Sequence, residues 1–102
     1  MTNLEYIAAN LTDEDILCQI AEEAAELSKA ALKLRRVLTG TNPTPVSEDE
    51  ALHNLCEEIA DVSLTEKVYF EQNKQRRLSG ALGLIVNDKA YRWAQRIKER
   101  KA

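Results

Sequence analysis

Six acidic side chains at matching positions of two segments are the residues of this sequence best suited to chemistry. Residues 20–27 and 55–62 agree in class at all eight positions: apolar, apolar, acid, acid, apolar, apolar, acid, apolar. The acids are Glu22, Glu23 and Glu26 in the first segment and Glu57, Glu58 and Asp61 in the second. Oxygen ligands presented three residues apart on two helices suit Mg²⁺ or Mn²⁺. The repeated pattern therefore predicts a divalent-cation site.

Helical phase divides these six acids into two groups. At about 100° per residue, we expect the core-facing stripes to run through Ile20, Ala24, Leu27, Ala31 and Leu34, and through Leu55, Ile59 and Val62. The acids closest to these stripes, and hence the predicted metal ligands, are Glu23, Glu26, Glu58 and Asp61. Glu22 and Glu57 point further out. The alternative is a solvated helix face on which Lys29 and Lys33 pair with the acids.

Two long helices must position the clusters. Thr12 with Asp15, and Ser47 with Glu50, resemble capping boxes that begin helices, and Gly40 is a typical helix stop. The Thr, Gly, Asn and Pro residues between positions 39 and 45, including Pro43, predict a loop that joins two antiparallel helices. The matched segments then come face to face.

Shorter helices are expected at the ends of the chain. A short helix is predicted over residues 3–8, and Asn87 or Asp88 is predicted to cap a final helix. The second long helix meets no breaker until Ser79 and Gly80, although an end several residues earlier is equally consistent with the pattern. Residues 81–86 are apolar but contain a glycine, so they fit either a short helix or an oligomer contact.

Composition indicates one all-α globular domain over residues 1–102. Hydrophobic residues make up 44% of the chain and charged residues 30%, with only three Gly and two Pro. No secretory leader and no apolar run of membrane-spanning length is present in the sequence, so a cytoplasmic protein without membrane contact is expected. Cys18 and Cys56 are too few for a disulfide framework and are predicted to be free, buried thiols.

Charge is distributed unevenly along the chain. Residues 1–62 have a formal charge of −9 and residues 63–102 a charge of +6, within a net charge of −3. An acidic half joined to a basic half suits a ligand of mixed charge, such as a metal-bound phosphate. The alternative is that the basic residues only solvate the last helix.

The motif pair resembles that of the MazG-like all-α nucleoside triphosphate pyrophosphohydrolases. That family has Glu-Glu-x-x-Glu on one helix and Glu-x-x-Asp on the next, which here are Glu22-Glu23-x-x-Glu26 and Glu58-x-x-Asp61. The resemblance extends over roughly residues 13–77. The loop between the motifs is longer than is usual in the family, and residues 63–65 lack the aromatic residue that some relatives place against the base.

The resemblance implies a single MazG-like helical domain that forms a homodimer or homotetramer. It also implies hydrolysis of an NTP or dNTP to the monophosphate and pyrophosphate, with Mg²⁺ (or Mn²⁺) bound by the four predicted ligands. Either Glu22 or Glu23 would orient or deprotonate the attacking water. The predicted phosphate-binding residues are Lys74, Arg77 and, more weakly, Lys67.

The sequence is also consistent with other functions. The basic stretch around Lys74 is equally consistent with an ordinary basic end of a helix. His53 is expected at the surface, and Tyr91 and Trp93 in a core or subunit interface rather than on a base. The main alternative to the enzyme is a non-catalytic helical oligomer or adaptor that binds a partner or a divalent metal. Nucleic-acid binding by the basic C-terminal helix is not expected, because its basic residues are spread around the helix.

Overall fold

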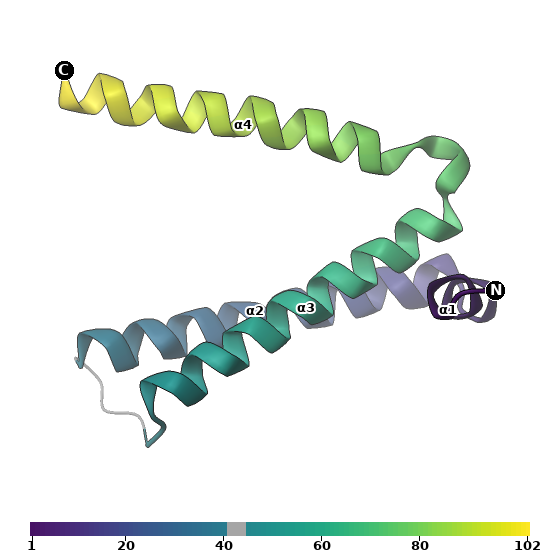
Figure 1. Ribbon diagram of the computed structural model, residues 1–102, viewed down its shortest axis with the longest axis horizontal. Coiled ribbons are helices and arrows are strands. Elements are labelled where there is room, and N and C mark those ends of the chain that lie inside the picture. The colour runs from purple at the N-terminus through teal and green to yellow at the C-terminus, as the bar shows by residue number, and fades with distance from the viewer. Residues whose placement is uncertain (41–44) are drawn as a thin grey trace. The chain divides into compact units, whose positions relative to one another are not determined.

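The computed structural model describes residues 1–40 and 45–102, and it is all-α, with no strand in those ranges. The chain divides into two compact units, Met1–Gln72 and Asn73–Ala102. The first unit contains helices α1 (Asn3–Asn10), α2 (Asp13–Thr39) and α3 (Glu48–Gln72), as Figure 1 shows. The second contains a short 3-10 helix (Lys74–Arg76) and helix α4 (Leu78–Lys101). The all-α prediction is confirmed.

The predicted start and end of α2 and the predicted start of α3 are confirmed by hydrogen bonds. The Thr12 hydroxyl accepts from the backbone N–H of Asp15 at 3.1 Å, which caps α2. Gly40 ends α2 with φ of 67°, a conformation that favours glycine, and its N–H donates to the Arg36 carbonyl at 2.9 Å. The Ser47 hydroxyl accepts from the Glu50 N–H at 3.1 Å at the start of α3. The centre of the predicted loop, including Pro43, lies outside the described residues.

Helices α2 and α3 form an antiparallel pair, and α1 packs against α3 (Figure 1). The side-chain amide of Gln72, the last residue of α3, donates to the Ala8 carbonyl at 3.3 Å and to the Leu11 carbonyl at 2.8 Å. These carbonyls belong to the last turn of α1 and to the residue that caps it, where no intrahelical donor is available. Gln72 therefore ties the end of α1 to the end of α3.

The stripe that α2 and α3 turn toward each other differs from the predicted one. Its members alternate in steps of four and three residues, and all are buried or half-buried. They are Ile16, Ile20, Glu23, Leu27, Ala30, Leu34 and Val37 on α2, and Ala51, Leu55, Glu58, Val62, Thr65, Tyr69 and Gln72 on α3. We call these residues the seam. Glu23 and Glu58 therefore lie within the seam, whereas the sequence placed them at its edge.

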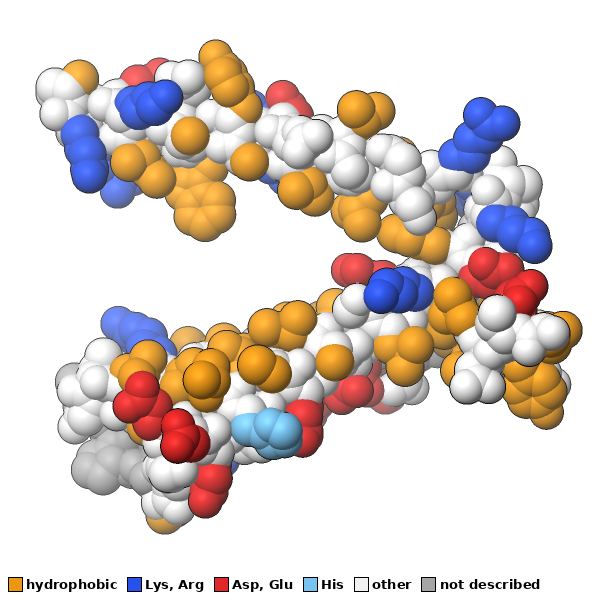
Figure 2. Space-filling model, viewed as in Figure 1, with side chains coloured by type: hydrophobic (Ala, Val, Ile, Leu, Met, Phe, Trp, Pro, Cys, Tyr) orange, Lys and Arg blue, Asp and Glu red, His pale blue; other side chains and the backbone are white. Residues whose placement is uncertain are grey.

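A second apolar stripe remains exposed on both helices. Its members recur every seven residues, and they are Leu17, Ala24, Ala31 and Leu38 on α2 and Leu52 and Ile59 on α3. Ala24, Ala31 and Ile59 were predicted to face the core but belong to this second stripe, and Ile59 is 51% exposed. Near the start of α3, Figure 2 shows hydrophobic side chains gathered along one edge of the helix and acidic ones along its other edge. The first unit thus has an apolar face that no described residue of that unit covers.

Two further predictions need correction. Cys18 and Cys56 are free but exposed, not buried, because both lie on sides of α2 and α3 that face away from the seam. The final helix begins at Leu78 rather than near Asn87, so residues 81–86 are helical.

Helix α4 contains no buried residue. Tyr91 and Trp93 are 64% and 65% exposed, so they form no core in this structure. None of the helices in the described residues contains a stretch that is both long enough and apolar enough to cross a membrane.

Candidate metal centre

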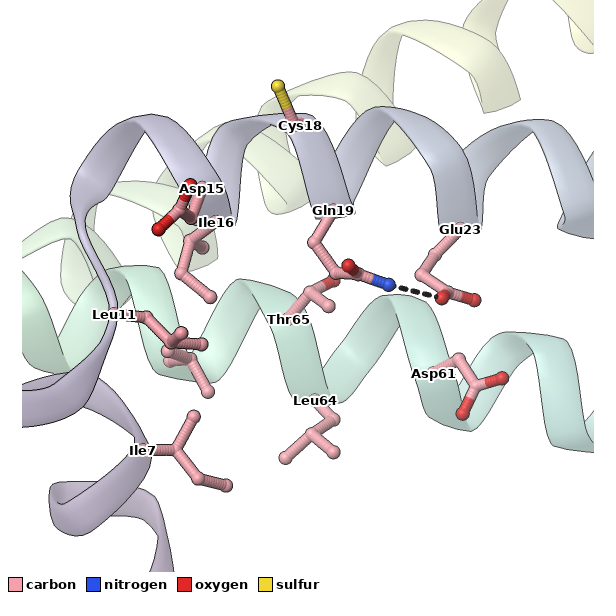
Figure 3. Close-up of a pocket in the computed structure, with 11 residues that line it drawn as sticks. Ile7, Leu11, Asp15, Ile16, Cys18, Gln19, Glu23, Asp61, Leu64 and Thr65 are labelled. Carbon is pink, nitrogen blue, oxygen red and sulfur yellow. Dashed lines mark hydrogen bonds between the residues drawn. The ribbon is translucent and has the colours of Figure 1, made fainter.

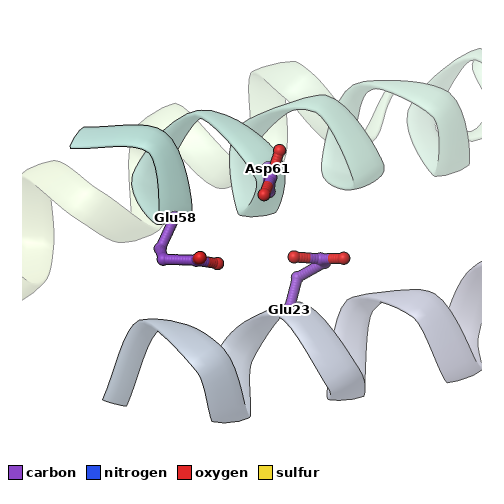
Figure 4. Close-up of side chains that lie close together, drawn as sticks. All are labelled: Glu23, Glu58 and Asp61. Carbon is purple, nitrogen blue, oxygen red and sulfur yellow. The ribbon is translucent and has the colours of Figure 1, made fainter. Parts of the chain in front are cut away.

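Three of the four predicted ligands converge between α2 and α3. Carboxylate oxygens of Glu23, Glu58 and Asp61 all lie within 4.8 Å of one another, and Figure 4 shows the three side chains pointing into a common space. Glu23 and Glu58 are half-buried because they belong to the seam, whereas Asp61 is exposed. The cluster therefore has an interior side formed by the helix pair and an open side toward solvent.

The pKa of Glu58 shows that the proximity of these carboxylates is electrostatically unfavourable. Partial desolvation raises the pKa of Glu58, and the negative charges of Asp61, Glu23, Glu26 and Glu57 raise it further. The protein therefore disfavours the charged form of Glu58 when no cation is near. A bound divalent cation reverses this preference, since it attracts the same carboxylates that repel one another.

Glu23 is held by its neighbour Gln19. The side-chain amide of Gln19 donates a hydrogen bond of 2.7 Å to Glu23 Oε1. The two residues are one helical turn apart on α2, so the backbone fixes their separation. Gln19 thereby restricts the orientation of a carboxylate that the seam already confines.

The remaining predicted acids lie outside the triad. Glu26 pairs with Lys29 at 3.4 Å with its side chain 53% exposed, although it shares a shallow depression with Glu58. Glu57 pairs with His53 at 2.7 Å, and the expected surface position of that histidine is confirmed by its 73% exposed side chain. Glu22 is exposed on α2. The structure thus groups three of the four predicted ligands and leaves Glu26 beside them.

The predicted phosphate-binding residues are divided between the two units. Lys67 is exposed on α3, six residues beyond Asp61. Lys74 lies in the 3-10 helix, and Arg77, with φ of 53°, links that helix to α4. Both belong to the second unit. Their phosphate-binding role stays a prediction.

A cavity of about 550 Å³ that no sequence pattern predicted adjoins the cluster. Figure 3 shows the residues that line it. Its apolar walls are Ile7 and Leu11 from the α1 region, Ile16 from α2, and Leu64 and Val68 from α3. A row of polar residues from α2, Asp15, Gln19 and Glu23, runs along one side, with Asp61 and Thr65 opposite. One end of the cavity is therefore formed by carboxylates of the triad.

The polar row was visible in the sequence as a spacing. Asp15, Gln19 and Glu23 are four residues apart, which places them along one side of α2 and spans about 12 Å at 1.5 Å per residue. The apolar walls were not visible in the same way, because Ile7 and Leu64 are 57 positions apart in the chain. Only the packing of α1 against α3 brings them together.

Comparison of the chain with protein-family models, with curated proteins and with solved structures finds no match to any of them.

Proposed function

We propose that this protein is a Mg²⁺-dependent nucleoside triphosphate pyrophosphohydrolase, which cleaves an NTP or dNTP into the monophosphate and pyrophosphate. The observation that supports this most is the convergence of Glu23, Glu58 and Asp61 at one end of a cavity with apolar walls. Carboxylates suit a metal that holds phosphates, and an apolar cavity suits a nucleoside. The resemblance of the two acidic motifs to the MazG-like family points to the same reaction.

The geometry of the triad fits Mg²⁺. Mg²⁺ binds oxygen at about 2.1 Å, so two oxygens that share one ion would lie about 3 to 4.2 Å apart. The triad oxygens lie within 4.8 Å of one another, so small side-chain rotations would bring them into that range. Three protein ligands would leave coordination positions for water and for phosphate oxygens. Glu26 is close enough to add negative charge to the site, since it raises the pKa of Glu58.

Mg²⁺ at this site supplies neutralisation of the phosphate charge and a more acidic water. The chain supplies the rest. Glu22 or Glu23 orients the attacking water and accepts its proton, while the water oxygen bonds to the α-phosphorus and the bond from that phosphorus to the bridging oxygen breaks. Pyrophosphate leaves with the bonding electrons. Lys67, Lys74 and Arg77 are the proposed partners of the phosphates.

A direct assay tests this proposal. The protein is incubated with each of the common NTPs and dNTPs and Mg²⁺, and pyrophosphate and nucleoside monophosphate are quantified. Equal amounts of the two products from at least one nucleotide are expected. Absence of both products with every nucleotide would refute the enzyme, and release of inorganic phosphate instead would indicate cleavage at the γ-phosphate.

Gln19→Ala is expected to weaken Mg²⁺ binding about tenfold. Loss of the 2.7 Å hydrogen bond frees Glu23 to rotate away from the triad, and removal of groups that orient metal ligands costs about 10 to 100-fold in affinity. The lower end applies because Gln19 is exposed. Isothermal titration with Mg²⁺ measures the change. Gln75→Ala, the same substitution at an exposed residue outside the first unit, serves as the control, and equal affinities of the two variants would contradict a role for Gln19.

The exposed apolar stripe supports a homodimer as the working form of the protein. Ala24 lies about 100° to one side of Glu23 around α2, and Glu26 about 60° to the other side. Ile59 and Asp61 have the same offsets from Glu58 on α3. Because the helices are antiparallel, these equal angular offsets place the apolar stripes of both helices on one face of the pair. Glu26 and Asp61 then lie on the opposite face. A second copy that covers the apolar face therefore leaves the triad open.

Ile59→Arg is expected to weaken self-association by at least about tenfold, because a charge is then buried in the apolar contact. The folded monomer should lose little stability, since Ile59 is 51% exposed. Sedimentation velocity over a concentration series measures the association, and circular dichroism checks the helical content. His53→Arg introduces the same side chain at an exposed position on another side of α3 and should leave association unchanged. A wild-type protein that is monomeric at all concentrations would contradict this assignment.

A further inference from the structure

Asp15 is the polar residue of the cavity that lies farthest along α2 from the triad. Two helical turns, about 12 Å, separate it from Glu23, and both residues line the same cavity. Asp15 also contributes its backbone N–H to the Thr12 cap, which fixes its backbone at the first turn of α2. A ligand with phosphates at the triad therefore has Asp15 at its opposite end.

The walls around Asp15 suit a flat apolar ring. Ile7, Leu11 and Ile16 line the part of the cavity contributed by α1 and the start of α2. Such side chains bury the faces of a nucleobase but offer no hydrogen bonds to its edge. The edge must then be recognised by the polar row, and Asp15 is its outermost member.

We propose that Asp15 makes this protein selective for nucleotides whose base has an exocyclic amino group. The inference rests on the proposed function, since it takes the triad as the phosphate end. An ionised carboxylate only accepts hydrogen bonds. Cytosine and adenine present an amino group as a donor on the base edge, whereas thymine and uracil present a carbonyl oxygen at the corresponding position. Asp15 is exposed, so the carbonyl oxygen disfavours binding by repelling the carboxylate rather than by leaving it desolvated.

Two pairs of nucleotides exchange this amino group for an oxygen, and within each pair the adjacent ring nitrogen also changes from an acceptor to an N–H donor. CTP and UTP differ in having an amino group or an oxygen at position 4, and ATP and ITP differ in the same way at position 6. The wild-type protein is expected to favour the amino member of at least one pair by about tenfold in kcat/KM, the lower end for one hydrogen bond to a charged group, because Asp15 is exposed.

Asp15→Asn provides the decisive test. Asparagine keeps an acceptor and adds a donor, so it accommodates both members of a pair, and the ratio of their kcat/KM values is expected to fall to about one. Asp13→Asn makes the same change in the same helical turn, at an exposed residue that does not line the cavity, and should preserve the ratio. It also controls for the loss of an acidic group near the helix N-terminus.

The possible outcomes separate this inference from the proposed function. Hydrolysis with equal kcat/KM within both pairs, or a ratio that Asp15→Asn leaves unchanged, overturns the role of Asp15 while the pyrophosphohydrolase stands. No hydrolysis of any nucleotide overturns the proposed function itself, and the inference with it. A ratio that falls equally in Asp13→Asn and Asp15→Asn refutes base recognition, because the effect then arises from helix electrostatics.

Discussion

Glu58→Gln is expected to abolish most of the activity and at the same time to stabilise the metal-free protein. Glu58 is the half-buried member of the triad on α3, and its neutral amide replacement is a poor ligand for Mg²⁺. Loss of a residue that merely orients a metal ligand costs about 10 to 100-fold, so loss of the ligand itself should lower kcat/KM by about 100-fold or more. Pyrophosphate release under saturating Mg²⁺ measures this effect.

The opposite change in stability follows from the same charges. Desolvation and the neighbouring carboxylates raise the pKa of Glu58, which means that its charge opposes folding when no metal is bound. Gln has no charge to repel, so the melting temperature of the variant in EDTA should exceed that of the wild type at neutral pH. A general folding defect would lower both activity and melting temperature, and the two explanations are thereby distinguished.

Glu57→Gln is the matched control for this experiment. Glu57 is adjacent in sequence, but it pairs with His53 at the surface and is not a member of the triad. Its activity and its affinity for Mg²⁺ should remain close to those of the wild type. Full activity in Glu58→Gln, or equal loss in both variants, would contradict the assignment of Glu58 as a ligand.

Mg²⁺ is expected to raise the melting temperature by about 10 °C when its concentration is 100 times its dissociation constant, because only the folded state presents the triad. The shift should grow as pH rises through the raised pKa of Glu58, since protons and Mg²⁺ compete for the same carboxylate. Differential scanning calorimetry in Mg²⁺ and in EDTA, repeated across pH, measures it.

The sign of the pH effect reverses without metal. A raised pKa in the folded state means that the folded protein binds the Glu58 proton more tightly than the unfolded chain does. The contribution of Glu58 to stability is therefore fully present below its ordinary pKa and is lost as pH rises through the raised value. The difference in melting temperature between Glu58→Gln and the wild type in EDTA should accordingly widen over that range. A Mg²⁺ shift that is the same at every pH, or equally large in Glu58→Gln, would contradict binding at the triad.

The local features of this fold were predictable because each depends on a few adjacent residues. The caps at Thr12 and Ser47 and the stop at Gly40 form as the sequence indicates, since a cap needs only a side-chain acceptor and a nearby N–H. The start of α4 was not predictable in this way. It follows Arg77, which makes no side-chain cap, and Gly80 and Gly83 then continue the helix despite their low propensity.

The sequence by itself determined that acidic residues repeat at matched positions on two helices, and hence that carboxylates gather between them. Tertiary structure decided which acids meet. Both α2 and α3 have two largely apolar stripes about 100° apart. One is the seam, which contains Glu23 and Glu58, and the other runs through Ala24 and Ile59. Periodicity alone does not say which stripe faces the partner helix. Packing also decided the cavity beside the triad. Its walls are formed by residues of α1, α2 and α3 that lie far apart in the sequence.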